Sequence, residues 1–194
     1  DVDDQPARPL GQHRTERDVQ LVEGEPVAVL AQVSHRQPSG QLHATVVVVM
    51  AGGATIPTDP DRYGQTTPED LGLLLEEIYY CARDGGGAIP LAFNGEVTQA
   101  ECQMMVQYLG LNRIGVLIQA GVPAGVTVAH KHGWANEEQD GLVHTMGDAG
   151  IVYSAGGDYV LSIYAYHPVQ ILFDQTNLLF ANLSSAAYNY FNLE

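Results

Sequence analysis

The pattern of apolar positions in the second half of the chain predicts three helices. The first spans residues 67–82, where Thr67 is a plausible N-cap and Pro68 occupies the first helical position. A capping box formed by Thr98 and Glu101 begins the second helix, 98–110. The third helix spans residues 176–191. The apolar stripes expected to face the core are Leu71, Leu74, Leu75, Ile78 and Ala82; Cys102, Met105, Val106 and Leu109; and Leu179, Leu183, Ala186, Ala187 and Tyr190.

Other apolar runs predict an antiparallel sheet. Strands are expected over residues 126–134, 147–154 and 159–166, and the segment "SAGGD" supplies a turn that joins the last two as a hairpin. The order helix, helix, strand, strand, strand, helix predicts an α+β fold in which the sheet packs against the helices. Residues 26–54 contain two further β-rich runs that look like a hairpin, but the sequence does not define how they pair with the other strands.

Composition divides the chain into three parts. Residues 1–25 are polar and rich in Pro, Arg and Asp, so we expect an extended arm or linker. The β-rich segment 26–54 follows, and residues 55–194 form the α+β region. The sequence begins at Asp1 without an initiator Met or a signal-peptide pattern, so we expect either that a preceding segment was removed or that this is a fragment.

Charge and motifs exclude several classes of function. The net charge of −15 argues against binding to nucleic acid or to an anionic membrane, because both need clusters of Lys and Arg. No apolar run approaches the roughly 20 residues that cross a bilayer, so we expect no membrane insertion. The glycine-rich segment 84–87 follows a helix and is not followed by Lys-Ser/Thr, so it is not a phosphate-binding loop. We predict no cofactor.

The two cysteines lie at corresponding ends of the first two helices. Cys81 is near the end of one helix and Cys102 is near the start of the next, so an antiparallel helical hairpin would place them level with each other. The sequence is compatible with two states of these cysteines. One is a disulfide, which would stabilise the fold by roughly 3 kcal/mol, and the other is a pair of buried free thiols, which pack as small apolar groups.

The only lysine of the chain lies in the segment "VAHKHGW". From residue chemistry alone, Lys131 is expected to pair at the end of a strand with Glu137, Glu138 or Asp140. His130 and His132 would share one face of the strand, with Lys131 on the other. Together with nearby residues they could form a zinc site, but the adjacent lysine opposes a cation, and we predict no metal; those residues are His144, Asp140 and Asp148.

Four segments, taken in order, resemble a known family. They are "TTPEDLGLLL", "VAHKHGW", "DAGIVYSAGGDYVLSIYAY" and an amphipathic helix. This series is similar to the C-terminal half of the serine β-lactamase and penicillin-binding-protein superfamily, particularly its class A-like branch, over about residues 55–192. That family uses the motifs S-x-x-K, S-D-N and K-T-G. Lys131-His132-Gly133 stands where K-T-G is expected.

The resemblance implies a role for each residue of this segment. Lys131 would attract a substrate carboxylate and influence proton transfer. Gly133 would let an acyl substrate lie close to the strand, and the backbone N–H of Trp134 would be one donor of the oxyanion hole. His132 replaces a hydroxyl residue that usually helps to hold a substrate carboxylate, a contact that an imidazole N–H can also make.

Two motifs of the family are missing from the sequence. Val128, not Ser, stands three residues before the single lysine, and no Ser-x-Asn occurs. We therefore expect a β-lactamase-like serine hydrolase scaffold that is inactive as this chain alone: part of a cleaved precursor, or a pseudoenzyme. The alternative is a non-catalytic structural or assembly protein. The expected partners are its own N-terminal half or another subunit, and an oligomer is compatible with the sequence. The family's usual setting and a disulfide together favour export to the periplasm or the extracellular space.

Overall fold

The fold is built on one five-stranded antiparallel sheet with strand order β2-β1-β5-β4-β3. The computed structural model describes residues 28–36, 42–50, 66–137 and 140–193, and for the first two ranges it describes the backbone only. The strands are β1 (Ala28–Arg36), β2 (Leu42–Met50), β3 (Thr127–Asn136), β4 (Val143–Tyr153) and β5 (Tyr159–Tyr166). β3 forms one edge of the sheet, so alternate backbone N–H and C=O groups along it have no neighbour within the sheet.

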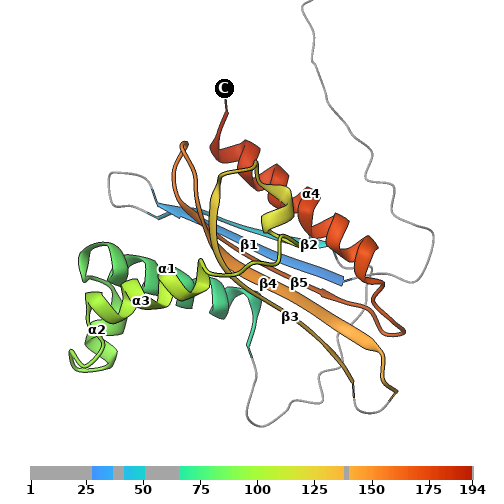
Figure 1. Cartoon of the computed structure of the whole chain (residues 1–194), viewed down its shortest axis with the longest axis horizontal. Helices are drawn as coiled ribbons and strands as arrows, with labels where there is room; N and C mark the ends of the chain where they lie inside the picture. Colours follow the sequence, from blue (N-terminus) through green and yellow to red (C-terminus); the bar gives the residue numbers. More distant parts are fainter. Residues whose placement is uncertain (1–27, 37–41, 51–65, 138–139, 194) are drawn as a thin grey trace, which may run out of the picture.

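Helices cover both faces of the sheet, which confirms the α+β class. Figure 1 shows α1 (Pro68–Asp84), α2 (Ala88–Ala92) and α3 (Gln99–Leu109) grouped on one side, and α4 (Phe173–Phe191) on the other. Successive residues of β5 point to opposite faces, as the pleat requires. Val160 therefore packs with Leu75 of α1, whereas Leu161 and Ile163 pack with Phe180 of α4.

The β-rich segment near the N-terminus belongs to this sheet. β1 pairs antiparallel with β2, and its other edge pairs with β5, where Ala31 lies opposite Ile163. Strands far apart in the sequence therefore share one hydrogen-bonded layer with the α+β region. The arm predicted over residues 1–25 lies outside the described residues.

Several element boundaries differ from expectation. β5 spans the residues predicted for it, but β4 begins at Val143, four residues early, and α4 begins at Phe173, three residues early. The short helix α2 and the 3-10 turn η1 (Gln119–Gly121) were not predicted. Both are too short to show an apolar period, which explains why the sequence pattern does not reveal them.

Each predicted apolar stripe is partly wrong. Leu74 and Met105 are exposed, whereas Leu75, Ile78 and Cys102 of the same predicted stripes are buried as expected. The buried face of α4 is also different: Ala186 and Tyr190 are exposed, and the fully packed residues are Thr176, Phe180 and Ser184. Ser184 is buried because its hydroxyl donates to the carbonyl of Ile118 at 2.8 Å, a contact that an apolar pattern cannot reveal.

The ends of α1 and α3 follow the predicted chemistry. Thr67 caps α1 and forms a capping box with Asp70, and Gly85 ends the helix with a φ of 73°, a conformation that suits glycine. The box of Thr98 and Glu101 opens α3. None of the helices in the described part of the chain combines the length and hydropathy that a membrane-spanning helix needs.

The disulfide between Cys81 and Cys102 is confirmed, with 5.8 Å between the two Cα atoms. Both sulfur atoms are buried in a small cluster with Ile78 and Ile89. The bridge therefore joins α1 to α3 on the side of the sheet that carries both helices. Since α1 also packs on the sheet, the bridge helps to hold this helical layer together.

Reduction of this disulfide is expected to lower the free energy of unfolding by about 3 kcal/mol, because the bridge closes a loop whose cysteines are 21 positions apart. Urea unfolding followed by circular dichroism, with and without dithiothreitol, measures the difference. The double variant Cys81→Ala/Cys102→Ala is the control, since dithiothreitol should leave its midpoint unchanged. An identical midpoint for oxidised and reduced protein would contradict the prediction.

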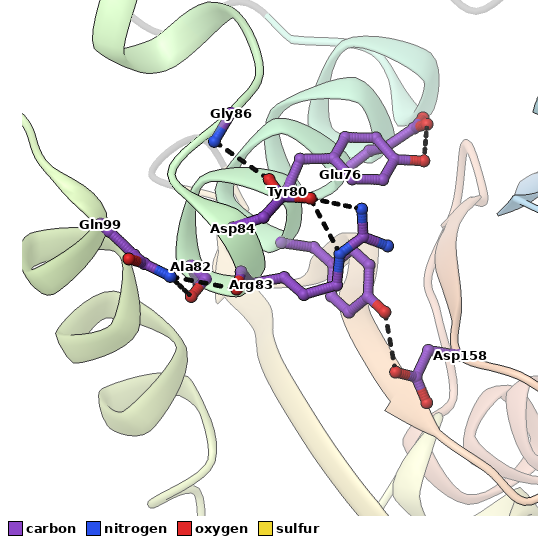
Figure 2. A network of polar contacts seen from close by, with 9 residues as sticks. Glu76, Tyr80, Ala82, Arg83, Asp84, Gly86, Gln99 and Asp158 are labelled. Atoms are coloured by element: carbon purple, nitrogen blue, oxygen red, sulfur yellow. Dashed lines mark hydrogen bonds and ion pairs between the residues drawn. The ribbon is translucent and has the colours of Figure 1, made fainter. Parts of the chain in front are cut away.

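A polar network fastens α1 to the turn between β4 and β5. The hydroxyl of Tyr79 donates to Asp158 at 2.9 Å, and the guanidinium of Arg83 lies over the ring of Tyr79 at 5.4 Å. Figure 2 labels Arg83 and Asp158 in this network. Arg83 also forms an ion pair with Asp84 at 2.7 Å. Two such attachments, the disulfide to α3 and this network to the sheet, fix the position of α1, whose first turns form one wall of the site described next.

Candidate functional site

A cleft of about 480 Å³ lies beside the N-terminal half of α1, on the face of the sheet that α1 and α3 cover. α1 contributes Leu71 and Leu75 as an apolar wall, and the edge strand β3 forms the opposite side. β4 and β5 supply the floor. The remaining lining residues are Lys131, His132, Gly133, Trp134, Ala135, Thr145, Gly147, Ala149 and Tyr164.

Lys131 is exposed and is the only lysine of the chain. Its ammonium donates to the carbonyl of His132 at 2.7 Å. Among the described residues it forms no ion pair, so the expected pairing with Glu137 or Asp140 is wrong; Asp140 instead contacts His144 at 2.8 Å. Glu138 lies outside the described residues. The cleft is therefore lined by one cation without a carboxylate partner in the described part of the chain.

Glycines keep the cleft open beside this cation. A Cβ atom built on Gly133 would meet no atom within 4 Å, so the space above it is free for a ligand. Gly133 lies opposite Gly147 on β4, where a Cβ would approach the ring of Tyr164 to 3.0 Å. The absence of a side chain at Gly147 thus lets the Tyr164 ring lie against β4 and form part of the floor.

A buried pair on the other face of the sheet supports this strand from behind. Nδ1 of His130 lies 3.0 Å from both carboxylate oxygens of Asp148, and the backbone N–H of Ile118 donates to the same carboxylate at 3.0 Å. His130 is 2% exposed and Asp148 is 1% exposed. The pair ties β3 to β4 and to the segment that leads into η1. In the described part of the chain, no three His, Cys, Asp or Glu residues form a group that could hold a metal.

His132 and Trp134 follow His130 on the face of β3 that α4 covers. The His132 ring stacks on Trp134 with 5.0 Å between centroids, and Trp134 packs edge-on against Phe173 at the start of α4. Burial lowers the pKa of His132, although the charge of Asp148 opposes this effect. Because it stacks on Trp134, the imidazole of His132 lies on the opposite face of β3 from the side chain of Lys131, as strand alternation predicts.

Comparison with known protein families shows which family this chain belongs to. The model of the beta-lactamase enzyme family matches residues 27–191 of the chain. The chain belongs to this family. Its scaffold is that of a β-lactamase-like serine hydrolase. A search of curated protein sequences finds no match.

Solved structures share the fold. The class A beta-lactamase from Bacteroides cellulosilyticus DSM 14838 matches with a TM-score of 0.52 and 21% identity, covering 66% of this chain and 42% of that one. A beta-lactamase from Chitinophaga pinensis DSM 2588 matches with a TM-score of 0.51 and 18% identity, covering 66% of this chain and 42% of that one. The TLA-1 extended-spectrum beta-lactamase gives a TM-score of 0.51 and 19% identity, with coverage of 64% and 41%. The chain thus spans about two fifths of the length of these beta-lactamases.

Sequence reasoning found β3 of the site but missed its surroundings. Tyr164 lines the cleft, but nothing in the sequence pattern of β5 distinguishes it from its neighbours. The pair of His130 and Asp148 was considered only as part of a metal site. A detectable signal was available for Asp148, because a carboxylate inside an apolar strand needs a buried donor.

Proposed function

We propose that this chain carries one wall of a β-lactamase-like acyl-transfer site and binds an acyl compound that bears a carboxylate. The exposed ammonium of Lys131 without a counter-charge among the described residues supports this proposal most directly. The carboxylate of the ligand would approach Lys131, and its acyl group would lie over Gly133. Leu71 and Leu75 would contact the apolar part of the ligand.

In the complete reaction, the hydroxyl of a serine attacks the carbonyl carbon of an amide or β-lactam. The C–N bond breaks, the amine nitrogen takes a proton, and water then hydrolyses the acyl-serine ester. Within this scheme Lys131 orients the carboxylate and influences proton transfer. The backbone N–H of Trp134 donates to the developing oxyanion. Gly133 and the backbone of His132 contact the substrate, because the imidazole of His132 lies on the opposite face of β3.

No serine of this chain stands in the S-x-x-K motif, so we propose that the chain alone is inactive. The nucleophile would come from an N-terminal half of the same protein or from another subunit. Export to the periplasm or the extracellular space fits both the family and the disulfide, because disulfides persist in oxidising compartments.

One observation favours a second candidate, a non-catalytic structural or interaction protein. The helical layer exposes several large apolar side chains, which are typical of a surface that binds another protein. They are Leu73, Leu74, Leu91, Phe93 and Tyr108. On this alternative, the same scaffold would serve assembly and the cleft would bind no small ligand.

The test measures turnover and binding separately. Purified chain should neither hydrolyse nitrocefin nor gain mass with a fluorophosphonate probe, but benzylpenicillin should bind weakly in a ligand-observed NMR titration. Lys131→Ala should weaken that binding by about 10- to 100-fold, the range for a lost charge-assisted hydrogen bond. The control Arg113→Gln removes an exposed positive charge elsewhere and should leave binding unchanged.

A second variant probes the space over the strand. Gly133→Val should fold normally, because a Cβ there meets no neighbour, yet it should reduce benzylpenicillin binding by filling the cleft. Acylation of the chain alone would overturn the inactivity proposed here. Binding that is absent, or that neither variant alters, would favour the interaction protein.

A further inference from the structure

His144 occupies a junction of three segments at one end of the sheet. It lies on β4, and its Nε2 is 2.8 Å from a carboxylate oxygen of Asp140 in the turn that follows β3. Its Nδ1 is 3.0 Å from the carbonyl oxygen of His167, in the connection between β5 and α4. The ring therefore bridges the β3–β4 turn and the connection that leads into α4.

Both ring nitrogens of His144 face groups that only accept hydrogen bonds. A neutral imidazole carries one N–H, so it can satisfy one of these acceptors but not both. The imidazolium carries two N–H groups and satisfies the carboxylate and the carbonyl together. The geometry alone thus favours the protonated ring, and the raised pKa of His144, caused first by its bond to Asp140, agrees with it.

This junction is continuous with the rim of the cleft. Thr145, the next residue of β4, lines the cleft, as do Trp134 and Ala135 at the end of β3. The backbone N–H of Ile171, just before α4, donates to the carbonyl of Val143 at 2.6 Å. Trp134 in turn packs on Phe173 at the start of α4. A change at His144 therefore acts on segments that hold the rim in place.

We propose that His144 is a pH-dependent clasp that holds the β3–β4 turn and the β5–α4 connection together and thereby orders the rim formed by Trp134, Ala135 and Thr145. The clasp itself stands on the geometry of His144. Its consequence for ligand binding rests on the function proposed for the cleft.

The surrounding charges set the pH range of the clasp. The turn contributes the carboxylates of Asp140 and Glu137, and both raise the pKa of His144. The connection contributes His167, whose Nδ1 accepts from the backbone N–H groups of Val169 and Gln170. Within the described part of the chain, the charged groups that shift the pKa of His144 are therefore the carboxylates of Asp140 and Glu137.

The sign of the pH dependence follows from the two shifts. The contribution of His144 is fully present below its ordinary pKa of 6.5 and is lost as the pH rises through the raised value. The contribution of Asp140, whose pKa is lowered first by its bond from the N–H of Leu142, is present above 3.8 and is lost as the pH falls through the lowered value. The clasp is therefore strongest in mildly acidic solution and weakens towards alkaline pH.

An NMR titration of the full chain tests the clasp without any ligand. The Cε1–H signal of His144 should titrate above the ordinary imidazole value, and the backbone amides of Trp134, Ala135 and Thr145 should shift with the same midpoint. In Asp140→Asn the His144 midpoint should fall towards the ordinary value. In His144→Gln the amide transition should disappear. Glu96→Gln, which removes an exposed carboxylate from another part of the chain, should change neither midpoint.

Circular dichroism confirms that the variants are folded before they are titrated. An ordinary midpoint for His144 in the unmodified protein, or one that Asp140→Asn does not move, would overturn the clasp. Rim amides that ignore the His144 titration would overturn its connection to the cleft. Neither result depends on benzylpenicillin, so a failure of the proposed function alone would not affect the clasp or its connection to the rim.

Discussion

Replacing Asp148 with alanine is expected to lower the free energy of unfolding by about 3–5 kcal/mol, the range for removal of one partner from a buried, hydrogen-bonded pair. The carboxylate accepts from the backbone N–H of Ile118 and contacts Nδ1 of His130. Alanine would leave both donors buried without an acceptor, and each such group costs about 1–3 kcal/mol. Urea or thermal unfolding followed by circular dichroism measures the loss.

Two further variants show whether the loss comes from these contacts. Asp148→Asn keeps the shape and one acceptor oxygen, so it should fall between the unmodified protein and Asp148→Ala. Asp174→Ala removes an exposed carboxylate from the first turn of α4 and should cost less than about 1 kcal/mol. If Asp148→Ala were no more destabilising than Asp174→Ala, the buried pair would not stabilise the fold as described.

Much of the fold could be predicted because local chemistry and tertiary structure agree there. Thr67 with Pro68, and Thr98 with Glu101, begin their helices as expected because caps depend on residues close in the sequence. The hairpin of β4 and β5 also follows from local pattern and turn residues. The disulfide was left open because the antiparallel arrangement of α1 and α3 is a tertiary fact, which the sequence only suggested.

The rest could not be predicted because it depends on which segments cross in space. Ser184 is buried on α4 since Gly121 of η1 passes so close that a Cβ on Gly121 would meet the Ala181 carbonyl at 2.2 Å. A search for apolar residues passes over such a serine. Likewise, Asp148 lies on the α4 side of the sheet, where it orders His130, whereas the site residue Lys131 lies on the other face. The sequence shows these residues, but not which face each will occupy or what will cover it.

These contacts explain how an edge strand can form one side of the cleft. β3 has only β4 as a neighbour in the sheet, and its order comes from contacts behind it: His130 with Asp148, and Trp134 with Phe173. The side chain of Lys131 and the open space at Gly133 lie on the opposite face. The packing of α4 against the sheet therefore affects the geometry of a cleft that α4 does not line.

Replacing Phe180 with alanine is expected to test that dependence and to destabilise the protein by about 3–5 kcal/mol, as for other buried Phe→Ala changes. Phe180 is 0% exposed and lies in the cluster between α4 and the sheet with Leu161 and Ile163. The control Leu178→Ala is on the same helix but is 61% exposed, so it should change stability by less than about 0.5 kcal/mol. Urea unfolding measures both.

At urea concentrations where Phe180→Ala stays folded, the backbone amides of Gly133 and Trp134 should also shift, because loosening α4 moves Phe173 against Trp134. If Phe180→Ala lost the expected stability but its amides at Gly133 and Trp134 matched those of the unmodified protein, the cleft would be independent of α4.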